Sequence, residues 1–295
     1  MNIFRKIQYN QYWNIGFCEQ SYDDLVRRKE LKRVRWLKHP YRDRWFADPF
    51  IYRVTDNEIV VFVEECPVEH PKGIISELVI DRSTMKLKDR FVLLEKDSHL
   101  SYPAILRMNS KVYVYPESGA SGQLCIYEYD EINHRLVDPR VILDEAVADA
   151  TIFADRGRFI MTATKFPNTQ AGLFLFSSDS LFGPFEQLGK NPIQETLSAS
   201  RNGGSFLKTS SRLYRPAQNC SVRYGGALSI MEVNSTLCYK ESFAFGINPL
   251  KGRYGLGLHT INYESGYFVI DGYGYYYPVV GRLYHSFRES LRSYI

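Results

Sequence analysis

A repeat of roughly 50 residues constrains the fold of this chain more than any other feature. Five short apolar segments recur at about that interval, and a turn and a second strand-like run follow each of them. The segments are FADPFIY from Phe46, LSYPAIL from Leu100, ADATIF from Ala148, NGGSFL from Asn202 and LHTINY from Leu258. A fixed period of this length is typical of four-stranded units stacked around an axis. The repeat predicts an all-β fold, a five-bladed β-propeller of four-stranded blades.

Helical periodicity is confined to two places, Tyr22 to Lys32 and the C-terminal HSFRESLRSYI. We therefore expect a short helical segment near the N-terminus and a helix at the C-terminus. The run YWNIGFC, or the later VRWLKH, has the composition of a strand that closes the last blade. Closure of this kind removes exposed sheet edges. Because no linker rich in Pro, Gly or Ser interrupts the chain, we expect residues 1–295 to form a single domain.

The net charge and the composition limit the kinds of binding partner that we expect for this protein. The net charge is +4, and basic residues gather between Arg27 and Lys38, with Glu30 among them. This run favours a solvated surface, although it also permits peripheral contact with a membrane. No aromatic RNA-binding signature accompanies it, so no nucleic-acid partner is expected. The aromatic share of 15% suits packed strands, and sugar-binding clefts also use such rings.

Cysteine usage and the absence of familiar motifs argue against cofactors. The five cysteines are odd in number, far apart and never in a CxxC pair, so neither a zinc site nor a disulfide framework is indicated. We expect reduced core thiols. The sequence has no dinucleotide or P-loop glycine motif, no HExxH and no GxSxG, and the histidines are scattered. We expect no cofactor and no metal.

Targeting signals are also missing from the sequence. The N-terminal MNIFRKIQYNQYWNIGF has no apolar core followed by a cleavage site, and no 18 consecutive residues are apolar. These features predict a cytoplasmic protein with no transmembrane segment.

Polar residues at the starts of the innermost strands form the candidate site. In a propeller these strands line the central channel and begin near one of its mouths, so residues far apart in sequence converge there. The polar residues near these positions are Asp48, His99, Tyr102, Asp149, Arg201, Asn202 and His259. Two carboxylates from different blades, Asp48 and Asp149, suit glycosidic chemistry. We expect these two to be catalytic and the others to bind substrate.

The second strands supply further polar groups. They contain Glu64, Glu65, Glu117, Arg215, Gln218 and Asp271. An arginine beside a glutamine can hold sugar hydroxyls, a carboxylate or a phosphate, because the guanidinium offers a planar fork of donors. We expect Arg215, Gln218 and Asp271 to bind substrate and Glu117 to take part in catalysis.

Several segments together resemble a known family. They are FADPF, HLSYPAI, YPES, DATIF, RLYRPAQNCSVRYGGALSIMEV and GLHTINYESGYFVIDG. Their order and spacing are similar to those in the N-terminal propeller domain of glucosamine inositolphosphorylceramide transferases. The resemblance covers roughly residues 35 to 280 and is most specific from 212 to 232. It implies the five-bladed fold shared with arabinanases, invertases and mannoside phosphorylases.

The resemblance also implies roles for site residues. In those hydrolases one Asp lies on the first strand of blade one, a second on blade three and a general-acid Glu on blade four. Asp48 and Asp149 match the first two positions. Blade four differs from the hydrolase pattern, because its segment SRNGGSFLK has no carboxylate. Arg201 and Asn202 stand near the position expected for the acid. Hydrolysis would therefore need Glu117, Glu65 or Glu195 as a replacement acid.

Three functions remain open on the sequence alone. The leading hypothesis is sugar transfer during assembly of a cell-surface glycan or glycolipid, with a sugar, a glycan or a nucleotide-sugar as substrate and a glycan-assembly enzyme as a partner. The second is a glycoside hydrolase or phosphorylase with a relocated acid. The third is a non-catalytic module that binds sugar and positions a partner enzyme. Fold alone does not choose among them.

Overall fold

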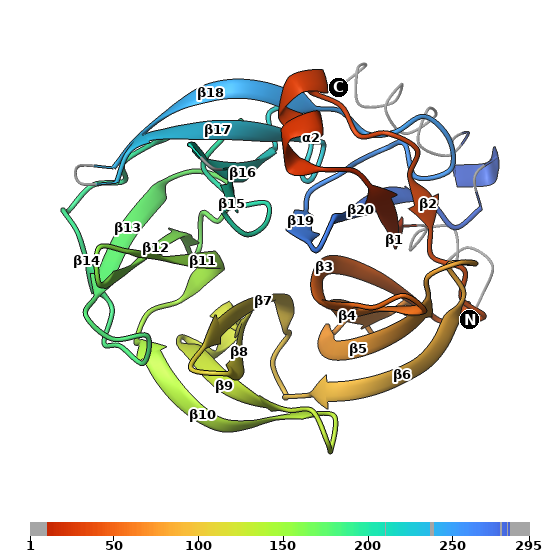
Figure 1. Cartoon of the computed structure of the whole chain (residues 1–295), viewed down its shortest axis with the longest axis horizontal. Helices are drawn as coiled ribbons and strands as arrows, with labels where there is room; N and C mark the ends of the chain where they lie inside the picture. The colour runs from red at the N-terminus through yellow and green to blue at the C-terminus, as the bar shows by residue number, and fades with distance from the viewer. Residues whose placement is uncertain (1–10, 210, 237–238, 278, 282, 284–295) are drawn as a thin grey trace, which may run out of the picture.

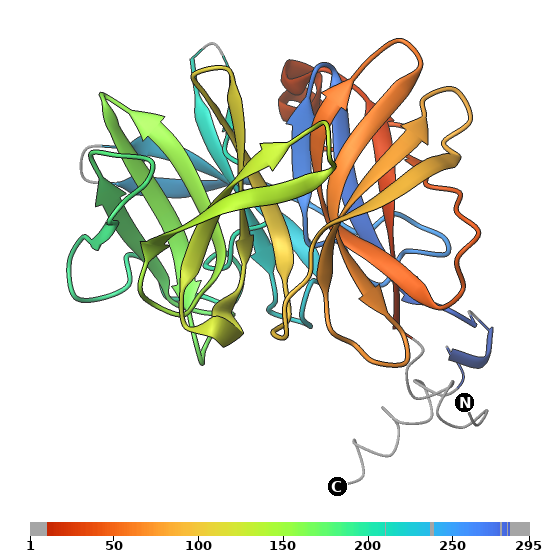
Figure 2. The ribbon, with the colours of Figure 1, turned by 90° about the horizontal axis from the view of Figure 1, so that it is seen from below.

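The computed structural model describes residues 11–209, 211–236, 239–277, 279–281 and 283. These residues form five four-stranded antiparallel sheets arranged around an axis, as Figure 1 shows in a view down that axis. The side view in Figure 2 shows the strands running between the two faces of the ring. The predicted fold class, a five-bladed β-propeller, is confirmed.

The first three blades are built from consecutive strands. Blade one contains β3 (Arg44–Val54), β4 (Glu58–Pro67), β5 (Ile74–Asp81) and β6 (Leu87–Leu94). Blade two contains β7 (Ser101–Met108), β8 (Lys111–Glu117), β9 (Leu124–Asp130) and β10 (Arg135–Leu143). Blade three contains β11 (Val147–Asp155), β12 (Arg158–Lys165), β13 (Leu173–Ser178) and β14 (Glu186–Gln187). The first strand of each lies nearest the axis (Figure 1).

The last two blades bring the chain back to its start. Blade four contains β15 (Leu207–Lys208), β16 (Leu213–Asn219), β17 (Ala227–Ser235) and β18 (Lys240–Ile247). Blade five contains β19 (Ile261–Glu264), β20 (Tyr267–Tyr275), β1 (Gln11–Glu19) and β2 (Arg35–Trp36). The sequence offered two candidates for the closing strand, and both are used: YWNIGFC lies in β1, and Arg35–Trp36 of VRWLKH forms the outermost strand β2.

The inner strands are apolar on both faces because each blade packs between two neighbours. In β4, Ile59, Val61 and Val63 belong to one buried cluster, whereas Val60 and Phe62 belong to another. Successive strand residues point to opposite faces, so the two clusters lie on opposite sides of the blade. This explains why EIVVFVEE reads as a continuous apolar run.

Helical structure is sparse among the described residues. The helix α2 (Tyr22–Arg28) begins where Ser21 accepts a hydrogen bond from the backbone of Asp24, and it ends at Lys29, whose φ of 58° breaks the helical path. A single 3₁₀ turn, η1, spans Gly119–Ser121. The C-terminal helix expected from HSFRESLRSYI lies outside the described residues.

Two other expectations can be compared with the fold. Cys18, Cys66, Cys125 and Cys220 are buried free thiols, and Cys238 lies outside the described residues. Within the part of the chain that the structure describes, no helix has the length and apolar character needed to cross a membrane.

Candidate active site at the mouth of the ring

A shared β-bulge presents polar residues at one mouth of the ring. In β3, β7 and β11 the pairing skips two residues, between Ala47 and Phe50, between Ser101 and Ala104, and between Ala148 and Thr151. The first skipped residues, Asp48, Tyr102 and Asp149, have φ values of 48°, 46° and 48°. Each non-glycine residue in this left-handed region costs about 1–2 kcal/mol. Such strain is concentrated at functional sites, where a bulge turns a side chain toward a new direction.

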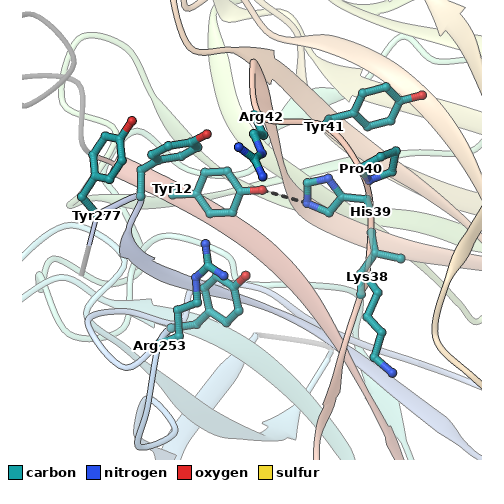
Figure 3. Close-up of a pocket in the computed structure, with 11 residues that line it drawn as sticks. Tyr12, Lys38, His39, Pro40, Tyr41, Arg42, Arg253 and Tyr277 are labelled. Carbon is teal, nitrogen blue, oxygen red and sulfur yellow. Dashed lines mark hydrogen bonds between the residues drawn. The ribbon is translucent and has the colours of Figure 1, made fainter. Parts of the chain in front are cut away.

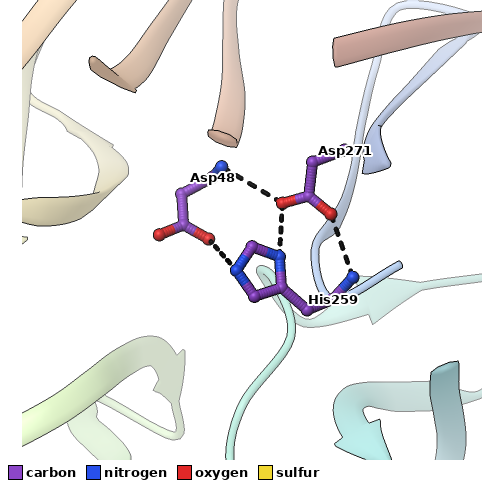
Figure 4. A group of neighbouring side chains, drawn as sticks. All are labelled: Asp48, His259 and Asp271. Carbon is purple, nitrogen blue, oxygen red and sulfur yellow. Dashed lines mark hydrogen bonds and ion pairs between the residues drawn. The ribbon is translucent and has the colours of Figure 1, made fainter. Parts of the chain in front are cut away.

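The first of two polar groups surrounds Asp48 and is drawn in Figure 4. We call Asp48, His259, Thr260 and Asp271 the Asp48 group. Asp48 Oδ1 accepts a 2.6 Å hydrogen bond from the Thr260 hydroxyl and lies 3.7 Å from His259 Nε2. On the other side of the imidazole, Nδ1 lies 2.5 Å from Asp271 Oδ2. The histidine is therefore held between two carboxylates from different strands.

The Asp48 group is arranged to bind a proton. Burial by itself would lower the pKa of His259, but the carboxylates of Asp271 and Asp48 outweigh it and raise the pKa to about 9. Burial raises the pKa of Asp48 to about 7, although the neighbouring imidazolium opposes this rise. The imidazolium therefore favours the ionised form of a carboxylate that burial would otherwise keep neutral.

The Asp48 group also has the donor types of a cation site. Ligand atoms of Asp48, His259 and Asp271 all lie within 4.8 Å of one another. However, Asp271 already accepts hydrogen bonds from the backbone N–H groups of Asp48, His259 and Thr260. The His259 ring shares its Nδ1 proton with the same carboxylate. These contacts fit a hydrogen-bonded network better than a metal site.

The second polar group surrounds Asp149, which accepts hydrogen bonds from a guanidinium and from side-chain amides. We call Asp149, Glu117, Arg201, Asn202 and Gln218 the Asp149 group. Asp149 Oδ2 accepts hydrogen bonds from Arg201 Nε at 2.5 Å and from Gln218 Nε2 at 2.7 Å. The Asn202 side chain donates to the Asp149 carbonyl at 2.8 Å. Only 2% of the Asp149 side chain is exposed, so this carboxylate is fixed in place.

Glu117 joins the Asp149 group from the neighbouring blade. Its Oε2 accepts a hydrogen bond from the Asp149 backbone at 3.1 Å and lies 3.6 Å from Arg201 Nη2. Burial and the charge of Asp149 raise the pKa of Glu117 well above its usual value, against the opposing effect of Arg201. This rise in pKa favours the neutral carboxyl group, the form that can donate a proton.

The two groups act on one another electrostatically. The charge of Asp149 raises the pKa of Asp48 and also that of His259. Eight of the eleven residues predicted at the site make up these two groups together with Thr260: Asp48, Glu117, Asp149, Arg201, Asn202, Gln218, His259 and Asp271. The Tyr102 backbone donates to Asp48 and the Arg215 side chain donates to Asn202. The roles of all eleven in binding or catalysis stay predictions.

With this geometry defined, comparison with known proteins assigns the family. Residues 36–249 match the family described as glucosamine inositolphosphorylceramide transferase 1, N-terminal. The chain belongs to this family. The match covers blades one to four and thus includes the whole Asp149 group, whereas His259 and Asp271 lie beyond it.

Curated relatives in the family are plant proteins. The chain is 29% identical over 205 residues to glucosamine inositolphosphorylceramide transferase 1 of Arabidopsis thaliana, an alignment that covers 67% of this chain and 27% of the relative. It is 26% identical over 199 residues to the protein of that name from Oryza sativa subsp. japonica, covering 65% of this chain and 27% of the relative. The chain thus matches about a quarter of the length of each relative.

Solved structures share the fold at low sequence identity. A family 117 glycoside hydrolase from Zobellia galactanivorans superposes with a TM-score of 0.56 at 10% identity, covering 91% of this chain and 92% of that one. The catalytic domain of the Coprinopsis cinerea family 62 α-L-arabinofuranosidase gives 0.57 at 8% identity, covering 74% and 76%. At these identities the likeness concerns the fold.

Arg215 departs from the expectation that it binds substrate. Its side chain is fully buried, and its five N–H donors meet five acceptors inside the protein. The acceptors are both carboxylate oxygens of Glu241, the side chain of Asn202 and the carbonyls of Ala199 and Ser200. Arg215 therefore positions Asn202 beneath the Asp149 group and has no donor left for a ligand.

Tyr102 likewise has a structural role in the protein interior. Its backbone N–H donates to Asp48 Oδ2, as a site residue should, but its ring is fully buried against Phe50. The hydroxyl bonds to Thr151 at 2.9 Å and accepts from the Gly204 backbone at 2.8 Å. Tyr102 thus connects three blades, and its side chain does not face a ligand.

The candidate acids suggested by the sequence have different surroundings. Glu65 is fully buried in ion pairs with Arg44 and Arg90. Glu195 is exposed in the loop that precedes Arg201. His99 lies at the rim, with 43% of its side chain exposed and Nε2 placed 3.3 Å from Glu64. Of the three acids considered, Glu117 alone belongs to the polar groups described here.

Sequence reasoning missed two aromatic residues of the site. The Trp13 ring stacks on His259 at 4.1 Å between centroids. Tyr224 packs its ring edge-on against His259 at 5.6 Å, with the Arg201 guanidinium 5.3 Å from the ring centre. Tyr224 nevertheless keeps 44% of its surface exposed. Its place in the turn RYGGA, directly after the strand of Arg215 and Gln218, was the signal that could have identified it.

Proposed function

We propose that this protein is carbohydrate-active and transfers a sugar during assembly of a cell-surface glycan or glycolipid, with the sugar bound at the mouth beside Tyr224. Membership of the family described as glucosamine inositolphosphorylceramide transferase 1, N-terminal, supports the reaction class. The observation that carries the proposal is geometric: one buried carboxylate, Asp48, lies beside His259, and a second carboxyl group, Glu117, bonds to the backbone of Asp149.

Asp48 is the base in this proposal. Its pKa of about 7 is close to what efficient general-base catalysis at neutral pH requires. It would accept the proton of an acceptor hydroxyl as the acceptor oxygen forms its bond to the anomeric carbon. His259, held by Asp271 and stacked on Trp13, stabilises the ionised form of Asp48.

Glu117 is the acid. As the bond between the anomeric carbon and the leaving oxygen breaks, Glu117 would give its proton to that oxygen. Burial and the charge of Asp149 favour the protonated form of Glu117, while Arg201 and Gln218 keep Asp149 in position. The acid in this proposal therefore lies in blade two.

The same acid supports hydrolysis or phosphorolysis as the second candidate. The specific observation is that burial and Asp149 raise the pKa of Glu117, which favours the protonated form that a glycosidase acid needs. The two candidates differ only in the acceptor, which is a hydroxyl of a glycan or lipid in transfer and water or phosphate in the alternative.

A substrate screen tests the proposal. The purified protein is incubated with nucleotide-sugars, with and without glycan or glycolipid acceptors, and with aryl glycosides. Product that forms only with an added acceptor supports transfer, and sugar released in buffer alone supports hydrolysis. Sugar binding without turnover of any donor or glycoside would overturn both and leave a sugar-binding module.

Glu117→Gln sharpens the test because a good leaving group needs no acid. We expect the variant to lose a hundredfold or more, about 3 kcal/mol, on substrates with a basic leaving group and little on 2,4-dinitrophenyl glycosides. Glu128→Gln is the matched control, since Glu128 pairs with Lys111 on the next strand and is partly exposed. Equal losses on both substrate types would remove Glu117 as the acid.

A further inference from the structure

A pocket lies outside the mouth, where blade five meets blade one. It has a volume of about 560 Å³ and is drawn in Figure 3. Its walls come from the start of β1, the segment between β2 and β3, the loop before β19 and the two residues that follow β20. We call it the outer pocket. Its lining residues are Tyr12, Leu37, Lys38, His39, Pro40, Tyr41, Arg42, Arg253, Tyr254, Tyr276 and Tyr277.

The outer pocket and the mouth lie on opposite sides of one strand. Trp13 of β1 stacks on His259 in the mouth, whereas the preceding residue, Tyr12, lines the outer pocket. Successive residues of a strand face opposite sides of the sheet. The sheet of blade five therefore separates the two places.

The charge of the outer pocket is uniformly positive. Its lining includes three cationic residues and no carboxylate. Arg42 and Arg253 are both exposed, and neither forms an ion pair with any described residue. The nearest acidic neighbour in sequence, Asp43, is already paired with Arg44 at 2.7 Å. Figure 3 shows both guanidinium groups directed toward the Tyr12–His39 pair.

The Tyr12–His39 pair has one hydrogen-bond donor to spare. The Tyr12 hydroxyl lies 2.9 Å from His39 Nε2, and the buried His39 Nδ1 has no partner among the described residues. Burial and the charge of Arg253 lower the pKa of His39 to about 4, so the ring is neutral near pH 7. A tyrosine and a neutral histidine carry one polar proton each, and their mutual bond uses one. When Nε2 carries the histidine proton and donates it to the Tyr12 hydroxyl, the hydroxyl proton is free for a ligand.

Aromatic rings give the pocket faces for an apolar or sugar ring. Tyr12 and Tyr254 stack with centroids 6.4 Å apart, and the Arg253 guanidinium lies 5.7 Å and 5.5 Å from their ring centres. Tyr276 packs edge-on against Tyr12 at 5.5 Å. Guanidinium groups bind phosphate through paired N–H bonds, and aromatic faces suit the ring that carries it.

We propose that the outer pocket is an anion site that binds a phosphate group carried by a sugar or by a lipid headgroup. Arg42 and Arg253 hold the phosphate oxygens, the Tyr12–His39 pair donates one further hydrogen bond, and the tyrosine rings contact the attached group. The site is separate from the proposed catalytic residues, so its occupation does not depend on their chemistry.

Titration calorimetry of the full chain with soluble probes tests the site. The probes are glucose 1-phosphate, inorganic phosphate and glucose. We expect the phosphate-bearing probes to bind, glucose to bind at least tenfold more weakly and binding to weaken with added salt. Arg42→Ala with Arg253→Ala should weaken phosphate binding at least tenfold, and the corresponding lysine variants should lose less. Arg33→Ala, which removes one positive charge from an exposed residue outside the pocket, should change nothing.

Vesicles distinguish the two sources of phosphate. Cosedimentation compares phosphatidylcholine vesicles with vesicles that also contain phosphatidylinositol. Loss of binding in the arginine variants with soluble probes identifies a sugar phosphate, and the same loss with vesicles alone identifies a lipid headgroup. Absence of binding to every phosphate probe, or equal losses in Arg33→Ala, would overturn the proposal. Asp48→Asn should bind these probes like the wild type, which separates this site from the proposed reaction.

Discussion

Two histidines on opposite sides of β1 show how the same side chain takes opposite roles. His259 in the mouth stacks on Trp13 and lies between two carboxylates, which raise its pKa to about 9. His39 in the outer pocket stacks on Tyr12, and burial together with Arg253 lowers its pKa to about 4. In the mouth, carboxylates next to His259 therefore stabilise its protonated form. In the outer pocket, burial and a neighbouring arginine favour the neutral form of His39.

The comparison extends to the arginines of the two places. Arg201 is buried and bound to Asp149, whereas Arg42 and Arg253 are exposed and lack ion pairs with described residues. A buried pair is part of the folded structure, and removal of one partner leaves an uncompensated charge. An exposed cation contributes little to stability and is free to meet a ligand.

The largest expected effect is on the stability of the mouth. Arg201→Ala leaves Asp149 buried without a counter-charge, so we expect the free energy of unfolding to fall by about 3–5 kcal/mol. Arg42→Ala should change it by less than about 0.5 kcal/mol. Denaturant unfolding of both variants measures the difference. Similar values for the two would show that Arg201 is not held as the structure indicates.

The next effect is on turnover. Asp48→Asn removes the charge that the proposed base needs, and we expect turnover to fall a hundredfold or more, about 3 kcal/mol, with nearly unchanged affinity for the sugar. Steady-state kinetics with the substrate found in the screen measure both quantities. Arg33→Ala is the control. Turnover equal to that of the wild type would exclude Asp48 as a catalytic residue.

The opposite pKa values of the two histidines predict opposite pH dependence. The folded protein binds the His259 proton more tightly than the unfolded chain, so its contribution is complete below pH 6.5 and is lost as the pH rises to about 9. The contribution of neutral His39 is complete above pH 6.5 and is lost as the pH falls to about 4. Each of these two pH-dependent changes in the free energy of unfolding should amount to about 1–3 kcal/mol.

Nuclear magnetic resonance of the imidazole rings checks these assignments directly. His259 should remain protonated to about pH 9, and His39 should stay neutral down to about pH 4. Asp271→Asn removes the carboxylate nearest His259 and should bring the pKa of His259 below about 8, a change worth at least about 1.4 kcal/mol. Identical titration of the two histidines would remove the contrast between mouth and outer pocket.

The smallest expected effect concerns the outer pocket. Tyr12→Phe removes the hydroxyl that bonds to His39 but keeps the ring in its stack, so we expect a loss of about 1 kcal/mol in the free energy of unfolding. Thermal unfolding measures it. Tyr41→Phe is a comparison within the same pocket wall, because no hydrogen bond of its hydroxyl joins it to a described residue. A larger loss for Tyr41→Phe would contradict the role given to the Tyr12–His39 pair.

The repeat alone predicted the number of blades and the equivalent positions of Asp48, Tyr102 and Asp149 in blades one to three. Apolar strands at a fixed spacing can be buried only by neighbours of the same kind, so a 50-residue period leads to a ring of blades. Equivalent positions in the repeat then receive equivalent geometry, which is why Asp48, Tyr102 and Asp149 share a bulge and a positive φ. Their convergence followed from the same alignment.

The tertiary structure decided which partner each of these residues has. Burial of a charge must be compensated by groups from other blades, and the repeat does not specify those groups. Thus Asp48 meets His259 across the junction of blades one and five, whereas Asp149 meets Arg201 and Gln218 of blade four. The sequence predicted that Arg215 binds substrate, but in the structure its donors bond to Glu241, Asn202 and Ala199.

The outer pocket was beyond the reach of the sequence for the same reason. Tyr12, His39 and Arg253 are brought together only because β1 completes the blade that β20 belongs to. In the chain they are separated by a short helix or by four blades, and no local pattern connects them. Ring closure places them side by side, because the last blade takes its outer strands from the start of the chain.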